Sequence, residues 1–329
     1  MRKGQNPAKL GTMPAYQAYP LGIASIVYIP EQIGYFKDAL EIFKIHLSSV
    51  HQYTSDPFDY LVFDNGSCPE VKEELMKLHQ DGWIDWVILS KANLGKTGAL
   101  NFLINAMPNE WICYADSDML FRPGWLEASW KINETFSGCG MIGSQVIFPD
   151  WEVDKGNTLF RKTIDPRYRF DQVCAQDWVI TEYCRARGIS EEKQHLFSEM
   201  LLDKVTCLEN GVEAFLGGNS HQQWLARKDI IQKILPLPAT QKLNRKEDTY
   251  QNQRLDELGY LHLTTTIPYL YHMGNTIDEE ILPEVQKLSN LQIEKRQQSE
   301  KENRKQSLLW KALVWLSHHK RSQRLLLRL

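Results

Sequence analysis

The sequence Trp-Ile-Cys-Tyr-Ala-Asp-Ser-Asp occupies residues 111–118 and is the pattern on which the predicted architecture of this chain rests. Its first five residues are apolar or aromatic, which is typical of a buried strand. Two carboxylates, Asp116 and Asp118, follow where that strand ends. They can point at one ligand, and hard oxygen ligands of this kind suit Mg²⁺ or Mn²⁺. A solvated turn gives the same pattern, so the surrounding sequence has to decide.

The same arrangement, an apolar run that ends in polar residues, recurs along the first half of the chain. Predicted strands and predicted helices alternate there; the strands are 23–29, 60–63, 84–89, 111–115 and 141–148, and the helices are 35–50, 69–80, 97–106 and 123–135. This alternation predicts an α/β fold with a mainly parallel sheet and helices on both faces. Ligands bind beyond the carboxyl ends of such strands. The polar segments 64–67, 93–96 and 116–118 should therefore meet at one crevice.

The second half of the chain is less regular. Residues 151–210 are rich in charge, Trp and Tyr, and we expect an insertion there with helices at 171–187 and 191–204. The later elements that the pattern predicts are a strand at 213–216, a helix at 246–258, and one or two strands between 261 and 271. Residues 1–20 should form a loose N-terminal arm, and residues 276–329 a helical, basic, amphipathic C-terminal extension.

Composition narrows the class of protein. Of 329 residues, 43% are apolar and 24% charged, which is ordinary for a globular protein and excludes a disordered chain, a collagen or a disulfide miniprotein. The net charge of −3 argues against non-specific nucleic-acid binding. The six cysteines lack metal-binding spacing, so free thiols in a reducing compartment are expected.

The basic charge is concentrated at the C-terminal end, where residues 285–329 hold eleven Lys or Arg and three Asp or Glu. Segment 307–329 mixes apolar, Trp and basic residues, which fits a helix lying on an anionic membrane surface. A helix that docks on its own domain, or on a second subunit of a homo-oligomer, fits equally well. Neither a signal-peptide core nor an apolar stretch long enough to span a bilayer occurs. We expect a cytoplasmic protein, peripheral on the membrane if 307–329 binds lipid.

Several motifs together resemble the family 2 glycosyltransferases of the GT-A fold, a Rossmann-like fold of nucleotide-diphospho-sugar transferases. They occur in the family's order between residues 23 and 275: Phe-Asp-Asn-Gly-Ser at 63–67, Asn-Leu-Gly-Lys-Thr-Gly-Ala-Leu-Asn at 93–101, Tyr-Ala-Asp-Ser-Asp at 114–118, Phe-Leu-Gly-Gly-Asn at 215–219, Glu-Asp at 247–248 and Tyr-His at 271–272. The resemblance implies a catalytic domain over 21–275, with 151–210 on the acceptor side.

The resemblance implies roles for the polar loops. Asp64 would pair with the nucleotide base, commonly uracil, although an Asp there also suits an Asx-turn. The other residues implied for nucleotide or donor binding are Pro30, Asn93, Lys96, Asp116, Ser117, Gly217, Gly218 and Asn219. The segment around Pro30 departs from the commoner family pattern, which weakens the base contacts expected there.

The resemblance also implies a metal site and a base. Asp118 would ligate Mn²⁺ or Mg²⁺ directly, with Asp116 and His272 completing the set, although a lone His there also suits a hydrogen-bonded core. Asp248, beside Glu247 at a helix start, would act as general base on the acceptor. Acidic residues also favour helix N-termini for electrostatic reasons alone. A single displacement would invert the anomeric centre.

The implied function is metal-dependent transfer of a sugar, from a nucleotide-diphosphate sugar such as a UDP-sugar, to a hydroxyl of a glycan, a lipid-linked acceptor or another biomolecule. Two alternatives stay open. A sugar nucleotidyltransferase would need a basic, glycine-rich loop after the first strand, and residues 30–34 contain no basic residue. A degenerate GT-A domain that only binds a nucleotide or glycan would not need the acidic pair at 247–248.

Overall fold

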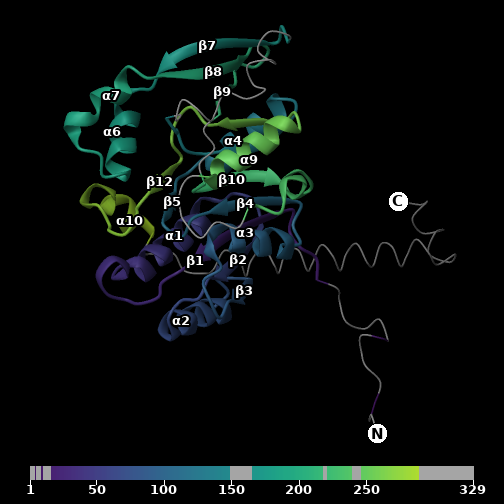
Figure 1. Ribbon diagram of the computed structural model, residues 1–329, viewed down its shortest axis with the longest axis vertical. Helices are drawn as coiled ribbons and strands as arrows, with labels where there is room; N and C mark the ends of the chain where they lie inside the picture. Colours follow the sequence, from purple (N-terminus) through teal and green to yellow (C-terminus); the bar gives the residue numbers. More distant parts are fainter. Residues whose placement is uncertain are drawn as a thin grey trace, which may run out of the picture. The chain divides into compact units, whose positions relative to one another are not determined.

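The structure is a computed structural model that describes residues 16–148, 165–217, 221–238 and 246–288, together with Gly4 and Lys9; for residues 246–248 it describes the backbone only. A ten-stranded sheet in the order β3-β2-β1-β4-β10-β6-β11-β9-β8-β7 runs through this part of the chain (Figure 1). The predicted arm, extension and segment 307–329 lie wholly or mostly outside the described residues and stay predictions.

Four parallel strands form the first half of the sheet: β1 (Leu21–Val27), β2 (Phe58–Asp64), β3 (Trp86–Leu89) and β4 (Trp111–Ala115). Successive side chains alternate between its faces. Thus Tyr60 and Val62 belong to one apolar cluster, and Leu61 and Phe63 to the other. Both faces are apolar because helices cover both.

The helices that connect these strands provide that cover: α1 (Ala39–Tyr53), α2 (Pro69–Gln80), α3 (Gly95–Ala106) and α4 (Trp125–Thr135). Side chains of α1, α2 and α4 pack into the first cluster, and those of α3 into the second, together with residues of α8 (Lys228–Ile231) and α9 (Lys246–Glu257). The predicted α/β fold, with helices on both faces, is confirmed.

The second half of the sheet is mixed. Its strands are β10 (Gln223–Arg227), β6 (Cys139–Gly143), β11 (Leu261–Thr264), β9 (Glu213–Leu216), β8 (Leu201–Cys207) and β7 (Tyr168–Cys174). Only β6 and β11 pair in parallel here. Strand β10 runs antiparallel between β4 and β6. It was not predicted, and its Trp224 is a fully buried core residue.

The helices predicted at 171–187 and 191–204 are partly wrong. The structure has β7, then α6 (Asp177–Ala186), a 3₁₀ turn at Glu191–Lys193, α7 (His195–Ser198) and β8. Strands β7 and β8 pair antiparallel over their whole length. No residue of β7 is fully buried, so its charged and polar side chains give no apolar signal, and cross-strand pairing decides its structure instead.

A separate two-stranded sheet joins β5 (Met119–Phe121) to β12 (Leu270–His272). Helix α1 fastens β5 from one side. The ring Nδ1 of His46 lies 2.6 Å from the carbonyl oxygen of Met119, and the Oγ of Ser49 accepts from the N–H of Phe121 at 3.0 Å. Because β5 follows Asp118 directly, these two contacts fix the end of the acidic turn.

The described chain ends in a 3₁₀ turn, η5 (Glu279–Ile281), and helix α10 (Leu282–Leu288), whose apolar residues pack against α1. All six cysteines are free thiols, as predicted. In the ranges that the structure describes, every helix is too short or too polar to cross a membrane.

The fully buried His46 predicts a pH dependence of stability. Burial penalises the charged ring and lowers the pKa of His46 from 6.5 to about 4. The unfolded chain therefore binds a proton on this ring more readily than the folded protein does. The free energy of unfolding is highest when the pH is above 6.5, and it falls as the pH is lowered from 6.5 toward 4. We expect His46 to cost about 2 kcal/mol of the free energy of unfolding between pH 7 and pH 5.

Denaturant unfolding at both pH values measures this loss. The variant His46→Gln should be less stable at pH 7 but lose less on acidification, whereas His195→Gln, at an exposed position, should follow the wild type. Equal losses in wild type and His46→Gln would contradict the prediction.

Candidate active site

Two loops beyond the carboxyl ends of β2 and β3 are joined by Asn65. Its Nδ2 donates to Oδ1 of Asn93 at 3.0 Å, and its Oδ1 accepts from the N–H of Leu94 at 2.8 Å. The adjacent Gly66 has a φ of +93°, and a Cβ there would lie 2.9 Å from the carbonyl carbon of Ala92. Glycine is required for both reasons. The loops 64–67 and 93–96 meet, as predicted.

Asp64 is fully buried at the end of β2. Its Oδ1 accepts from the N–H of Ser67, three residues further on, at 3.0 Å, so the side chain closes a loop one residue longer than the Asx-turn that the sequence allowed. Its Oδ2 has no hydrogen-bond partner, and the Nζ of Lys72 lies 3.7 Å away. The Oγ of Ser67 accepts from the N–H of Ile29 at 3.0 Å, so the same loop holds the chain just before Pro30.

Lys96 and Asp116 form the charged centre of the site. The Nζ of Lys96 lies 2.7 and 2.8 Å from the two carboxylate oxygens of Asp116 and donates to the carbonyl of His221 at 2.9 Å. The hydroxyl of Tyr114 also donates to Asp116. Burial works to raise the pKa of Asp116, but the charge and hydrogen bond of Lys96, the charge of His221 and the hydrogen bond from Tyr114 together outweigh it and hold that pKa below its ordinary value. Asp116 is therefore an anion at neutral pH.

Asp118 and His272 meet because β5 and β12 pair. His272 stands opposite Met119 in the register, and the N–H of Met273 donates to the carbonyl of Asp118 at 2.9 Å. The ring Nε2 of His272 lies 3.1 Å from Oδ2 of Asp118. The carboxylate and imidazole that the resemblance implies as metal ligands thus adjoin, from residues 154 positions apart in the chain.

The other ring nitrogen of His272, Nδ1, lies 3.0 Å from the carbonyl oxygen of Ala186. A carbonyl only accepts, so Nδ1 carries a hydrogen; the carboxylate of Asp118 also only accepts, so Nε2 donates to it in this metal-free structure and would give up that hydrogen to ligate a metal. Burial works to lower the pKa of His272, but the hydrogen bond and charge of Asp118 outweigh it and raise that pKa above 6.5. A metal-ligating histidine needs its second ring nitrogen to donate to a backbone carbonyl or a carboxylate, as Nδ1 of His272 does to Ala186.

The fit of a divalent metal can be tested on Asp118 itself. Its Oδ1 is buried without a hydrogen-bond partner, which is costly unless a ligand fills the position. Carboxylate oxygen and imidazole nitrogen suit Mn²⁺, and Mg²⁺ needs only one or two protein carboxylates when substrate phosphates supply the rest. In the described part of the chain, however, no three His, Cys, Asp or Glu side chains converge to hold a metal. Asp116 is bound to Lys96 instead.

A small hollow, partly open to solvent, lies beside His272. Helix α6 forms one wall with Glu182, Tyr183, Ala186 and Arg187. The guanidinium carbon of Arg187 lies 3.9 Å from the centre of the Tyr183 ring. The segment 151–210, predicted on the acceptor side, therefore contributes a polar and aromatic wall next to the proposed metal pair.

The remaining residues predicted to bind the nucleotide or donor make no hydrogen bond to Lys96 or to the carboxylates of the acidic turn, or lie outside the described residues. Pro30 and Ser117 are half-buried in their loops. Gly217 ends β9 with a φ of +75°, and its N–H donates to the carbonyl of His262 in β11 rather than to the acidic turn. The roles predicted for Gly218, Asn219 and the side chains of Glu247 and Asp248 lie outside the described residues.

Sequence reasoning missed several residues that shape the site. Tyr114 could have been found, since residues 114 and 116 lie two apart on one strand and share a face. Asn65 belonged to a recognised motif but was given no role. His46 and the carbonyl of Ala186 carry no sequence signal, because they reach the site only through tertiary packing.

Comparison with known families gives one match by sequence. Residues 39–184 match the family described as Glycosyl transferase family 2. This segment contains α1, the loops after β2 and β3, the acidic turn and most of α6. The family inferred from the motifs is thereby confirmed for this segment. The curated proteins contain no match to the chain.

Three solved structures resemble the fold. TarS of S. aureus (residues 1–349) shares 13% identity with a TM-score of 0.43, covering 82% of this chain and 64% of its own. GalNAc-T7 with UDP, GalNAc and Mn²⁺ shares 10% sequence identity with a TM-score of 0.49, and the match covers 78% of this chain and 44% of GalNAc-T7. The mannosyltransferase PcManGT of Pyrobaculum calidifontis, with GDP-Man and Mn²⁺, shares 11% sequence identity with a TM-score of 0.43, and the match covers 80% of this chain and 63% of PcManGT. The chain thus spans 44% to 64% of their lengths.

The pair Lys96–Asp116 predicts a large loss of stability when its cation is removed. The side chains are 11% and 23% exposed, so Lys96→Met would leave a mostly buried carboxylate unneutralised. We expect the free energy of unfolding to fall by about 2 kcal/mol. Lys44→Met is the matched control, because Lys44 makes an equally close contact with Glu74 at the surface and should cost less than about 1 kcal/mol. Equal losses in urea unfolding would refute the buried pair.

Proposed function

Because residues 39–184 belong to Glycosyl transferase family 2, we propose that this protein is a metal-dependent, inverting glycosyltransferase that uses a UDP-sugar. The acceptor is a hydroxyl group of a glycan, a lipid-linked molecule or another biomolecule. The observation that carries the metal dependence is the buried, unbonded Oδ1 of Asp118 beside Nε2 of His272.

Asp118 and His272 would hold Mn²⁺ or Mg²⁺ between them. When bound, the ion neutralises the charge that develops on the departing diphosphate. Asp118 supplies the charged oxygen, and the carbonyl of Ala186 keeps the lone pair of His272 directed toward the ion. Asp116 stays anionic beside Lys96, so Lys96 cancels its charge and limits repulsion of an incoming diphosphate.

The base and ribose of the donor would occupy the joined loops beyond β2 and β3. The unbonded Oδ2 of Asp64 is an acceptor of the kind that a ring N–H of uracil requires. Asn65 ties both loops, so the position of Asp64 and that of Asn93 depend on each other. This preorganisation lowers the cost of ordering the site when a nucleotide binds.

Asp248 of α9 is the proposed general base, with Glu247 beside it. It removes the proton from the acceptor hydroxyl as that oxygen attacks the anomeric carbon. The bond from the anomeric carbon to the diphosphate breaks in the same step, and the diphosphate leaves with the electron pair. One displacement inverts the anomeric centre, so an α-linked donor yields a β-linked product.

Replacing the proposed base should separate catalysis from binding. We expect Asp248→Asn to lower the transfer rate at least about 100-fold, since a positioned base contributes that much, while the dissociation constant of UDP stays within a factor of about three. Glu257→Gln, an exposed carboxylate on the same helix, is the control and should transfer normally. Normal transfer by Asp248→Asn would show that another group is the base.

Nucleotide binding should depend on the metal and on Asp118. A thermal-shift series with UDP, GDP, CDP and TDP, with and without Mn²⁺, should show stabilisation by UDP that EDTA abolishes. At a hundredfold excess over Kd the expected gain is about 2.7 kcal/mol. Asp118→Asn should remove the metal-dependent part. Binding of UDP without any transfer activity would favour a degenerate binding domain, and no shift with any nucleotide would contradict the donor site.

A further inference from the structure

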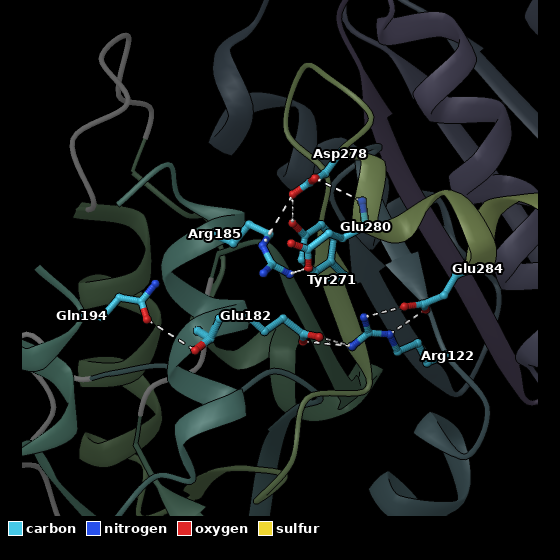
Figure 2. A network of polar contacts seen from close by, with 9 residues as sticks. Arg122, Glu182, Arg185, Gln194, Tyr271, Asp278, Glu280 and Glu284 are labelled. Atoms are coloured by element: carbon cyan, nitrogen blue, oxygen red, sulfur yellow. Dashed lines mark hydrogen bonds and ion pairs between the residues drawn. The ribbon is translucent and has the colours of Figure 1, made fainter. Parts of the chain in front are cut away.

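A single guanidinium, that of Arg122, joins three segments far apart in the chain (Figure 2). Its Nη1 donates to both carboxylate oxygens of Glu182 in α6, at 2.8 and 2.9 Å. Its Nε and Nη2 donate to the two oxygens of Glu284 in α10, at 2.9 and 3.0 Å. Paired, charge-assisted hydrogen bonds of this kind fix the orientation as well as the distance of their partners.

Arg122 lies at the end of the same short strand that begins after Asp118. Strand β5 occupies the three positions between these two residues, and the N–H of Arg122 donates to the carbonyl of Tyr269, next to β12. The guanidinium carbon lies 5.7 Å from the centre of the Tyr271 ring, one residue before His272. The two-stranded sheet therefore carries the proposed metal pair at one end and Arg122 at the other.

The helix that Arg122 holds also orients His272. Glu182 and Ala186 are one turn apart on α6, and the carbonyl of Ala186 accepts the hydrogen bond from Nδ1 of His272. The connection thus runs from Arg122 through Glu182 and the backbone of α6 to the imidazole. Arg122 itself does not line the hollow beside His272.

We propose that Arg122 is a positioning residue which, by holding Glu182, keeps the carbonyl of Ala186 on Nδ1 of His272 and so directs Nε2 toward the metal position beside Asp118. The inference rests on the proposed metal role of His272. It goes further in assigning the orientation of that ligand to a charged contact at the other end of β5.

The charges around Arg122 show why its loss would move α6. Burial raises the pKa of Glu182, and the neighbouring Arg122 opposes this shift, while Glu284 adds to it. Without the cation, two carboxylates would face each other in a place where Arg122 and Glu182 are each only 18% exposed. Repulsion between Glu182 and Glu284 would push α6 away from α10, and the lost contact with Arg122 would loosen α6 from the end of β5.

A second contact keeps α6 attached in such variants. The Nε of Arg185 in α6 lies 3.8 Å from Oδ2 of Asp278, just before η5, and the same guanidinium pairs with Glu280 in η5. The hydroxyl of Tyr271 donates to Asp278 at 3.3 Å (Figure 2). Because these contacts do not involve Arg122, we expect Arg122→Gln to fold with α6 shifted rather than detached.

The test compares three variants of the full chain: Arg122→Gln, and the isosteric Glu182→Gln and Glu284→Gln. Glu284→Gln is the matched control, since Glu284 bonds the same guanidinium through two hydrogen bonds but belongs to α10. The first readout is the dissociation constant of Mn²⁺ for the protein without substrate, by electron paramagnetic resonance titration. The second is the tautomer of the His272 ring in the metal-free protein, from its ¹⁵N shifts at a pH high enough for the ring to be neutral, assigned with His272→Gln.

We expect Arg122→Gln and Glu182→Gln to weaken Mn²⁺ binding about 10- to 100-fold, the range found when residues supporting a metal ligand are removed. Both should also shift His272 away from the Nδ1–H form. The Mn²⁺ dissociation constant of Glu284→Gln should stay within a factor of about three of the wild-type value, even if its melting temperature falls as far as that of the other two variants.

Two results would overturn the inference. If all three variants lose melting temperature yet keep the Mn²⁺ affinity and the His272 tautomer of the wild type, Arg122 is only structural. If wild-type protein binds Mn²⁺ no better than His272→Gln does, the proposed metal site itself fails, and the role of Arg122 fails with it.

Discussion

Three residues of β5 pair with three residues of β12, and the arrangement of the candidate site depends on this short ladder. It sets Asp118 and His272 side by side although they are far apart in the chain. Helix α1 fixes β5 from within the core through His46 and Ser49. On the other side, α6 reaches His272 through one carbonyl. A small sheet therefore connects the core of the fold to α6.

The three aspartates of the loops have different electrostatic surroundings. Asp64 is buried and accepts from the N–H of Ser67, Asp116 is neutralised by Lys96, and Asp118 keeps one buried oxygen without a hydrogen bond. A buried acceptor without a partner is costly, and a bound cation offsets that cost. Of the two carboxylates in the acidic turn, Asp118 is therefore the one prepared for a metal. The predicted participation of Asp116 as a ligand would require it to leave Lys96.

The first half of the fold was predictable because β1, β2 and β4 are buried on both faces and each helix has an apolar stripe; α2, for example, spans residues 69–80 as expected. The meeting of three loops followed from strand polarity alone. Strands β7 and β8 were missed, because charged and polar residues interrupt the alternation of their apolar residues, although several residues of β8 are buried. The contacts of His46, Ala186 and Arg122 could not be predicted, since each depends on packing between segments distant in the sequence.

The central claim is that Asp118 and His272 together bind a divalent ion that carries the donor diphosphate. Its most direct test is a crystal structure of the protein with Mn²⁺ and UDP, with anomalous scattering measured at the manganese edge. The account predicts one anomalous peak in contact with Oδ1 of Asp118, Nε2 of His272 and the diphosphate oxygens. A peak that contacts neither residue, or ordered UDP with no peak between them, would contradict it.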